Sequence, residues 1–356
     1  MIHDFKIVGF RHFRNVELNQ LKRVNLFVGK NSSGKSSILE ALVLFFSEMS
    51  TRYLPMIQAA RNENWDAADE DTAIPLRHLF HNHVLPEIGA PGISLSSTND
   101  PRSFELKVQN FKVETDGQIT SYTATTEDMF IDPEFLEPCI VIERPGYIRR
   151  FSRLDKLSQM RRMISPFMKG THQVFFVPTR GVGDRELANL WDLVSLTDAE
   201  ADVIAGLKLI DPNVEGVAFV GSQTRERTAL VRLRNHSEPV ALKSLGDGMN
   251  RILQIIVSLV NAKNSALIID EFENGLHWSV QQEVWALVFR LAQLLNVQVF
   301  ATTHSRDCIQ GFEKAWAEDT AIGSFARVQK INNEASVREY TFDLLKDSID
   351  MDVEVR

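Results

Sequence analysis

Eight residues near the N-terminus constrain this chain more than any other stretch. Residues 29–36 read Gly-Lys-Asn-Ser-Ser-Gly-Lys-Ser and match the pattern G-x-x-x-x-G-K-[ST]. They follow the short apolar run 23–29, which suits a buried strand, and precede residues 38–46, whose apolar side chains recur at helical spacing. A phosphate-binding loop needs this context of strand before and helix after. The sequence therefore predicts that this loop binds a nucleotide.

Each part of the loop has a chemical reason to be there. The glycines let the backbone approach phosphate oxygens closely, while N–H groups and the helix N-terminus supply positive potential. Lys35 would place a cation on the β- and γ-phosphates, and the hydroxyl of Ser36 would bind Mg²⁺. The predicted nucleotide-binding residues of the loop are Gly29, Lys30, Asn31, Ser32, Ser33, Gly34, Lys35, Ser36 and Ser37.

Such a loop also predicts an acidic residue at the end of another buried strand. The apolar run 266–269 is followed directly by Asp270 and Glu271. We expect Asp270 to hold Mg²⁺, directly or through water, and Glu271 to polarise the attacking water as a general base. His304 ends a further apolar run, one helix and one strand later. If the two strands are neighbours in a parallel sheet, His304 would reach the γ-phosphate and sense hydrolysis.

Five motifs in a fixed order resemble those of the ABC-type ATPases. They are the loop 29–36, "SLGDGMNR" at 244–251, "LIIDE" at 267–271, "ENGLH" at 273–277 and "TTHS" at 302–305. More narrowly, the chain resembles the SMC/RecF/OLD branch, whose members begin with a strand and N-F-R-x-F. Here that start reads Gly9-Phe10-Arg11-His12-Phe13. The resemblance is good over residues 1–48 and about 225–310 and weak between 50 and 220.

The resemblance implies a role for each matching position. Arg11 would lie near the nucleotide, Glu271 would be the catalytic base, and His304 would be the switch histidine. Lys35 would act in catalysis, and Ser36 with Asp270 would hold Mg²⁺. The loop that crosses a dimer interface, or D-loop, would comprise Glu273, Asn274, Gly275, Leu276 and His277. The signature, acting on the ATP of the opposite subunit, would comprise Ser244, Leu245, Gly246, Asp247 and Gly248.

Two departures from the family pattern bear on activity. Gly246 stands where the family's serine meets the γ-phosphate of the opposite subunit, and Ser244 lies two positions earlier. The lost hydroxyl is expected to weaken the ATP-bound dimer or to slow hydrolysis. Residues 175–181 occupy the region of the Q-loop, where Gln173 and Arg180 are alternatives for its functional side chain. Arg180 alternatively is an ordinary surface arginine.

The expected fold is α/β, an ABC-ATPase-type P-loop fold with a mixed central sheet, an antiparallel β subdomain and a helical insertion. Between Lys35 and the signature we expect a β-hairpin turning at residues 116–117, helices over 150–168 and 185–208, and a strand over 173–178. Residues 50–100 favour short helices over sheet because they are polar and punctuated by Pro and Gly. The expected segments of one ATPase head are 1–48, the insertion 49–102, the β-hairpin region 103–145, the helical subdomain 146–215 and the lobe 216–356.

Composition narrows the partners. The net charge of −8 argues against a chain that coats nucleic acid. A basic cluster over 147–170 favours a solvated helix face over a nucleic-acid or partner surface. Cys139 and Cys308 predict reduced structural thiols, and His78, His81 and His83 lack the spacing of a metal site. Without a signal peptide or an apolar span, the chain is expected in the cytoplasm and not in a membrane.

A Gly-rich helix start is a second anion site, yet one chain cannot easily aim it and the phosphate-binding loop at the same γ-phosphate. Two chains placed head to tail can, so ATP binding is expected to form a homodimer and hydrolysis to loosen it. About 50 residues follow His304, too few for the Toprim nuclease that OLD-type proteins append. The sequence therefore favours an ATP-hydrolysing switch for a separately encoded effector such as a nuclease, similar to ATPases of bacterial anti-phage defence.

Two other functions stay open on the sequence. The first is a RecF-like protein in which ATP closes a dimer around duplex DNA. The second is a scaffold that binds ATP and hydrolyses little of it, which the glycine at position 246 would permit.

Overall fold

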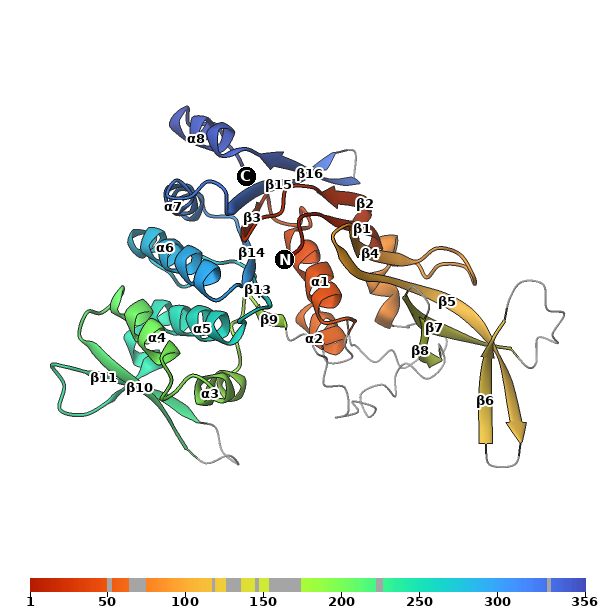
Figure 1. Ribbon diagram of the computed structural model, residues 1–356, viewed down its shortest axis with the longest axis horizontal. Helices are drawn as coiled ribbons and strands as arrows, with labels where there is room; N and C mark the ends of the chain where they lie inside the picture. The colour runs from red at the N-terminus through yellow and green to blue at the C-terminus, as the bar shows by residue number, and fades with distance from the viewer. Residues whose placement is uncertain are drawn as a thin grey trace.

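The computed structural model describes residues 1–49, 53–63, 75–116, 119–125, 136–144, 147–153, 174–221, 227–331 and 334–356. Three sheets and the helices around them make up this part of the chain. Figure 1 shows the central sheet seen edge-on, with helices on both sides and a long antiparallel arm on the α1 side.

The central sheet places the ends of its parallel strands along one edge. Its strand order is β16-β15-β3-β14-β13-β9, and all neighbours pair in parallel except β15 and β16. Its strands are β3 (Val24–Val28), β9 (Val174–Val177), β13 (Ala266–Ile269), β14 (Gln298–Thr303), β15 (Gly323–Ile331) and β16 (Glu334–Tyr340). Every residue of β3, β13 and β14 is buried, as their largely apolar sequences predict for strands covered on both faces.

Helices cover the two faces of this sheet with separate cores. On one face lie α5 (Asp247–Asn261), α6 (Trp278–Leu294) and α7 (Arg306–Trp316), and on the other lies α1 (Lys35–Phe46) (Figure 1). The first core centres on Trp285, whose ring stacks on Phe272 with centroids 3.7 Å apart. The remaining helices are α2 (Tyr53–Ala60), α3 (Asp184–Asp192), α4 (Ala199–Lys208) and α8 (Phe342–Asp350), with short 3₁₀ turns at Pro75–Leu79, His81–His83 and Leu242–Leu245.

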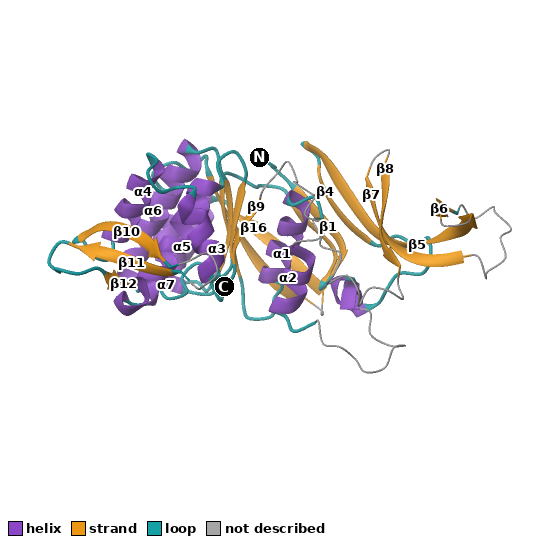
Figure 2. Cartoon of the chain, turned by 90° about the horizontal axis from the view of Figure 1, so that it is seen from below, coloured by secondary structure: helices purple, strands orange, loops and turns teal. Residues whose placement is uncertain are grey.

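Two antiparallel sheets flank the central one. The larger has the order β2-β1-β4-β5-β7-β8, with β6 also paired to β5, and Figure 2 shows it reaching far from the helices as an arm. Its strands are β1 (Phe5–Phe10), β2 (Phe13–Leu18), β4 (Ile93–Ser97), β5 (Asp100–Asp116), β6 (Ile119–Ala124), β7 (Leu136–Arg144) and β8 (Tyr147–Arg153). The smaller sheet, beside α3 and α4, consists of β10 (Val214–Val220), β11 (Thr228–Leu233) and β12 (Val240–Ala241).

The fold class is confirmed, since a mixed central sheet and an antiparallel subdomain are both present. The hairpin is also confirmed, because Asp116 pairs with Ile119, while residues 117 and 118 lie outside the described ones. The expected helix over 150–168 is wrong for residues 150–153, which extend β8. The insertion is not purely helical, because residues 93–97 form β4 and pair with β1. The alternation of apolar side chains over these five residues is a short signal, and the Pro- and Gly-rich residues around it favoured a prediction without strands.

Smaller predictions also need correction or lie outside the described residues. The helical stretch 185–208 is two helices with a break at 193–198. The basic cluster beyond residue 153 lies outside the described residues. Gln173 also lies outside them. Cys139 and Cys308 are both buried. Over the described residues, no helix combines the length and apolar character that a bilayer crossing needs.

Candidate functional site

The phosphate-binding loop joins β3 to α1 at the carboxyl end of the strand. Gly29 and Gly34 have φ angles of 150° and 112°, which glycine adopts without steric penalty. A Cβ atom at Gly29 would lie 2.2 Å from the carbonyl oxygen of Val328, and one at Gly34 would lie 2.9 Å from the Phe13 ring. The two glycines are therefore required both by conformation and by close packing. The loop ends at the N-terminus of α1, where free N–H groups attract phosphate.

Lys35 is folded back over this loop. Its Nζ donates hydrogen bonds to the carbonyl oxygens of Gly29 at 2.6 Å and Lys30 at 3.2 Å. Burial lowers the pKa of Lys35, and the carboxylates of Asp270 and Glu271 oppose that shift. A bound phosphate would replace neutral carbonyl partners with a charged one, which makes a stronger hydrogen bond. Lys35, which is predicted to bind the phosphates, thus lies at the loop.

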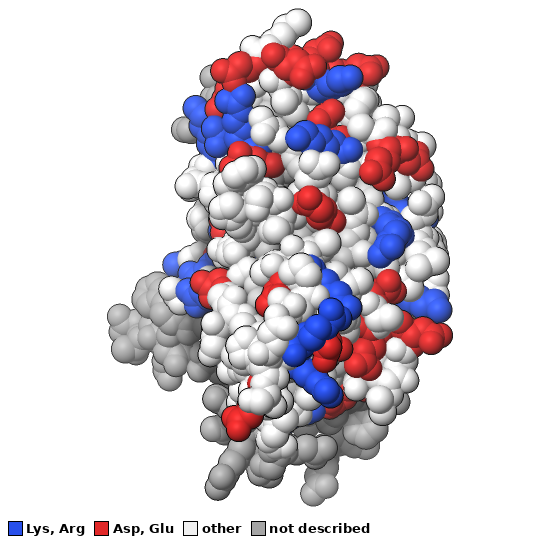
Figure 3. Space-filling model, turned by 90° about the vertical axis from the view of Figure 1, so that its left-hand side faces the viewer, with Lys and Arg blue, Asp and Glu red and all other residues white. Residues whose placement is uncertain are grey.

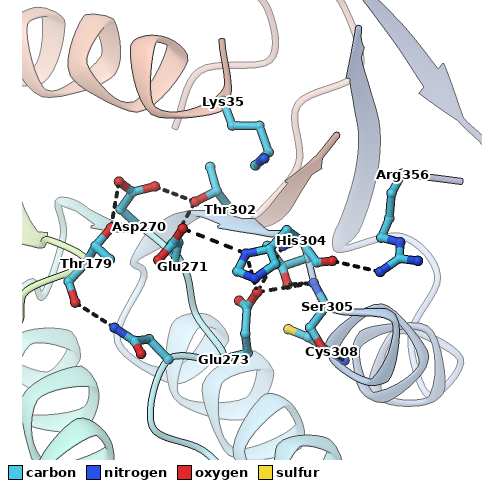
Figure 4. Close-up of polar contacts among 12 residues, drawn as sticks. Lys35, Thr179, Asp270, Glu271, Glu273, Thr302, His304, Ser305, Cys308 and Arg356 are labelled. Carbon is cyan, nitrogen blue, oxygen red and sulfur yellow. Dashed lines mark hydrogen bonds and ion pairs between the residues drawn. The ribbon is translucent and has the colours of Figure 1, made fainter. Parts of the chain in front are cut away.

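Asp270 lies at the end of β13 and contacts three hydroxyl groups from different parts of the chain. Ser36 donates to its Oδ1 at 3.2 Å, Thr302 donates to the same oxygen at 2.6 Å, and Thr179 donates to Oδ2 at 3.1 Å. Figure 4 shows the two threonines on either side of the carboxylate. These contacts fit the predicted Mg²⁺ pair, because Mg²⁺ takes oxygen ligands from one or two side chains and the phosphates.

Glu271 adopts a left-handed backbone conformation with φ of 52°. Its N–H donates to Oγ1 of Thr302 at 2.9 Å, so one threonine fixes both acidic residues. Burial and the neighbouring Asp270 carboxylate raise the pKa of Glu271, with burial the larger cause. A raised pKa makes a carboxylate a better proton acceptor, as a general base requires. Thr302 stood within the "TTHS" motif, but the sequence analysis gave it no role.

His304 lies beside these carboxylates, as predicted. Strands β13 and β14 are parallel neighbours, with Ile269 opposite Ala301. The Nδ1 atom of His304 is 3.1 Å from Glu273 and 3.7 Å from Glu271. Its side chain is 51% exposed, and contact of its ring with the γ-phosphate stays a prediction.

The cavity over the loop has a volume of about 280 Å³. Its lining consists of His12, Asn31, Ser32, Gly34, Lys35, Ser36, Ser37, Arg61, Asp270 and Glu271. Six of the nine predicted loop residues and both acidic residues therefore share one space. Lys30 and Ser33 line an adjoining cavity with Arg327 and Arg356.

Arg11 is not among the residues that line the cavity. Its guanidinium is buried against Glu40 and makes two hydrogen bonds to Glu63 at 2.7 and 3.2 Å. Glu40 in turn accepts a 2.7 Å hydrogen bond from Arg61, which also donates to Ser37 at 3.3 Å. Arg61 is thus the arginine that faces the loop, with Arg11 behind it. Arg61 was not predicted because this residue lies in the insertion, where the resemblance to the family is weak. Contact of Arg11 with the nucleotide stays a prediction.

The signature residues surround the start of α5. Gly246, with φ of 95°, is exposed, as are Ser244 and Asp247. A Cβ atom at Gly248 would lie 2.9 Å from the carbonyl oxygen of Gly275. The signature and the D-loop therefore touch each other within one chain and form one continuous surface. Their contact with a second subunit stays a prediction.

One turn into α5, Arg251 ties the signature helix to the acidic residues. It is 5% exposed, and its guanidinium donates to the carbonyl oxygens of Asp270 at 2.7 Å, Glu271 at 2.8 Å and Pro178 at 3.1 Å. Burial lowers its pKa to about 10, opposed by the carboxylates of Asp270, Glu273 and Glu271. The sequence offered "SLGDGMNR" as a motif, yet nothing in it showed where the final arginine points.

The Q-loop region follows β9. Thr179 contacts Asp270 through its hydroxyl, and its carbonyl oxygen accepts a 2.8 Å hydrogen bond from Asn274 of the D-loop. Arg180 is exposed and lines a second cavity of about 470 Å³ together with Arg61 and Asp270. Thr179 is therefore the residue of this region that contacts both Asp270 and the D-loop. The role of Arg180 stays a prediction.

The three histidines of the insertion do not form a metal centre. His78 and His83 face each other with Nδ1 atoms 3.3 Å apart, while His81 contacts the carbonyl oxygen of Arg11. Among the residues that the structure describes, no group of three or more His, Cys, Asp or Glu side chains is arranged to hold a metal ion. A Mg²⁺ ion held by Ser36 and Asp270 would need no such group, because Mg²⁺ takes only one or two protein side chains together with phosphate oxygens.

Sequence comparison identifies the family. Residues 1–179 match the family described as AAA ATPase domain. The chain belongs to the AAA ATPase domain family. Residues 183–307 of this AAA ATPase match a second family, an AAA domain whose description refers to the AbiEii toxin and a Type IV TA system. The first match ends at Thr179, and the second begins at residue 183.

Relatives and solved structures define the branch of this AAA ATPase. It is 22% identical over 342 residues to an ATP/GTP phosphatase of Helicobacter pylori, covering 87% of each chain. It is 23% identical over 214 residues to the DNA replication and repair protein RecF of Clostridium perfringens, covering 59% of this chain and 54% of that one. An Smc head bound to the C-winged helix domain of ScpA has the same fold, with a TM-score of 0.52, 12% identity and coverage of 98% and 99%. The chain is thus similar in sequence to RecF-type proteins and shares its fold with an Smc head.

Proposed function

We propose that the chain binds ATP and hydrolyses it with the site described above. The observation that carries this proposal is the joint attachment of Asp270 and Glu271 to Thr302, with Ser36 on Asp270 and Lys35 facing both carboxylates across the loop. Lys35 binds the β- and γ-phosphates, and Glu271 accepts the proton of the attacking water. Ser36 and Asp270 would hold Mg²⁺, which neutralises charge on the phosphates when bound. The relationship to an ATP/GTP phosphatase supports hydrolysis.

We further propose that ATP joins two copies of the chain head to tail. The exposed residues of the signature and the D-loop form one surface, and the open cavity over the phosphate-binding loop is another. Each cavity in the dimer receives the signature of the partner copy at its γ-phosphate. Hydrolysis removes that shared ligand and so weakens the dimer. Gly246 has no side-chain hydroxyl and can offer the phosphate only its backbone N–H. We therefore expect ATP turnover to be slow.

We propose that this switch controls a separately encoded effector, plausibly a nuclease, in anti-phage defence. The match to a family whose description names the AbiEii toxin and a Type IV TA system supports such a setting, and we expect the switch to act in the cytoplasm. The relatives named RecF favour a second candidate, an ATP-dependent DNA-binding protein of DNA repair. Both candidates use the same ATP-driven dimer and differ in what the dimer holds.

The dimer is tested by a variant that binds ATP without hydrolysing it. Glu271→Gln removes the base while keeping the size of the side chain, so ATP and Mg²⁺ should accumulate a dimer or larger assembly on sizing with light scattering. The matched control is Glu283→Gln, an exposed position of α6, which should behave as the wild type. A molecular mass that is the same with and without ATP in Glu271→Gln would contradict the head-to-tail switch.

A further inference from the structure

The side chain of Glu273 points into its own chain although it belongs to the D-loop. Its Oε1 atom accepts hydrogen bonds from the N–H of His304 at 2.9 Å and the N–H of Ser305 at 3.1 Å. The same oxygen lies 3.1 Å from Nδ1 of His304. Figure 4 shows Glu273 directly below the histidine, with the Ser305 contact at the start of α7. Three polar groups of one short segment therefore converge on one carboxylate oxygen.

This arrangement decides which ring nitrogen of His304 carries hydrogen. A carboxylate oxygen accepts hydrogen bonds, so Nδ1 must be the donor in its contact with Glu273. The hydrogen bond made by one ring nitrogen fixes the state of the other. The second carboxylate near the ring, Glu271, lies 3.7 Å from the same Nδ1 atom. The Glu273 carboxylate therefore holds hydrogen on Nδ1, and the nearby charge of Glu271 favours it there, so Nε2 of the neutral ring carries no hydrogen.

The backbone contacts fix the ring in space as well. The N–H groups of His304 and Ser305 are the first donors after β14 ends at Thr303, so their attachment to Glu273 sets the exit of the chain from the strand. Arg356 donates to the carbonyl oxygen of His304 at 3.1 Å from the other side. The side chain of Glu273 is only 10% exposed, so water competes little for these bonds. The histidine is thus held at its backbone and at its ring by a single side chain.

We propose that Glu273 is a positioning residue that orients His304 and fixes its tautomer for ATP hydrolysis within its own subunit. The family pattern instead implies that this loop acts across a dimer interface, and the exposed residues Asn274, Gly275 and His277 are free to do so. Glu273 thereby couples the D-loop to the switch histidine, because any movement of the loop moves its carboxylate. The inference rests on the proposed hydrolysis, since His304 is expected to act on the γ-phosphate.

Turnover measurements test the role. Glu273→Ala should lower kcat about 10- to 100-fold, the usual cost of a misplaced catalytic group, while the Kd for ATPγS stays within about twofold. Glu273→Gln keeps an accepting oxygen and should return kcat to within about threefold of the wild type. In a His304→Ala background, Glu273→Ala should lower kcat no further, because Glu273 acts through the histidine. Glu283→Ala on α6 serves as the control.

Other results overturn the proposal. Equal losses in the Gln and Ala variants, or additive losses of Glu273→Ala and His304→Ala, would show that Glu273 does not act through the orientation of His304. Denaturant unfolding shows whether Glu273→Ala is folded. If it is not, the test uses the kcat of Glu273→Gln compared with that of His304→Ala. The full chain is used throughout.

A second measurement does not depend on hydrolysis. Ring ¹⁵N spectra of the full chain at alkaline pH, with the signal of His304 identified by its loss in His304→Ala, should show hydrogen on Nδ1 and none on Nε2. Glu273→Ala should shift this signal toward a mixture of tautomers. An unchanged tautomer contradicts the inference even if ATP is hydrolysed. If the wild type hydrolyses no ATP yet the tautomer depends on Glu273, the proposed function fails and the positioning of His304 stands.

Discussion

At the scale of residues, the protonation of Glu271 decides whether the site can accept a proton. Burial and Asp270 raise its pKa above the ordinary glutamate value. A general base must be ionised, so kcat should rise with pH as Glu271 loses its proton, and this rise should centre above pH 4.5. Initial rates at saturating ATP between pH 4.5 and 8 measure this profile. A midpoint below pH 4.5 in the wild type would be inconsistent with Glu271 as the buried base, and Glu283→Gln should leave the profile unchanged.

Lys35 provides a second prediction at this scale. Its Nζ is the one described cation that donates to the loop carbonyls of both Gly29 and Lys30, and Ala at this position leaves no positive charge for the β- and γ-phosphates. Lys35→Ala should weaken ATP binding at least about 100-fold, since hydrogen bonds between charged groups are worth about 1.5–3 kcal/mol or more when buried. Isothermal titration measures the Kd. The matched control is Lys263→Ala, an exposed lysine outside the loop, and retained affinity in Lys35→Ala would refute the loop assignment.

At the scale of elements, α5 links two parts of the ATP machinery that serve different nucleotides in the proposed dimer. Its start carries the signature, and Arg251 one turn later binds the backbone of Asp270 and Glu271. A shift of α5 would therefore displace the acidic residues at the end of β13. This connection gives a physical route by which the signature at one ATP reports to the acidic residues at the other.

Arg251→Met tests this connection. Methionine retains much of the side-chain length but leaves three buried carbonyl oxygens without their donor, so the free energy of unfolding should fall by about 3 kcal/mol. Denaturant unfolding measures the loss. The control Arg290→Met removes an exposed arginine of α6 and should change stability by less than about 0.5 kcal/mol. Equal stability of Arg251→Met and the wild type would show that the guanidinium does not support this junction.

At the scale of the whole molecule, charge separates the two candidate functions. The chain carries a net charge of −8, and on the face that Figure 3 presents, basic and acidic side chains alternate rather than forming a basic stripe. The effector switch therefore predicts that the ATP-bound Glu271→Gln variant does not shift duplex DNA at physiological salt. An ATP-dependent shift that weakens steeply with salt would favour the RecF-like function instead. Electrophoretic mobility at several salt concentrations distinguishes them, with Lys35→Ala as the control for ATP dependence.

Much of the central sheet and the loop could be read from the sequence because their signals are local. The strands β3, β13 and β14 are short and mostly apolar, and each is followed by a motif that indicates its chemistry. The insertion and the arm were harder, because β4 pairs with β1 more than 80 residues earlier, as Lys6 opposite Ser96 shows. The side chains of β4 alternate between buried and half-buried, but five residues do not indicate which distant strand they pair with.

By itself, the sequence determined the phosphate-binding loop, the acidic pair at 270 and 271 and the histidine at 304, because each depends on a strand end and the residues that follow it directly. Only the tertiary structure decided that Arg61 faces the nucleotide cavity while Arg11 binds Glu40 and Glu63 behind it. It likewise decided that Glu273 turns toward His304. The physical reason is that a buried charged side chain takes the partner that packing brings to it, and that partner lies far away in the sequence.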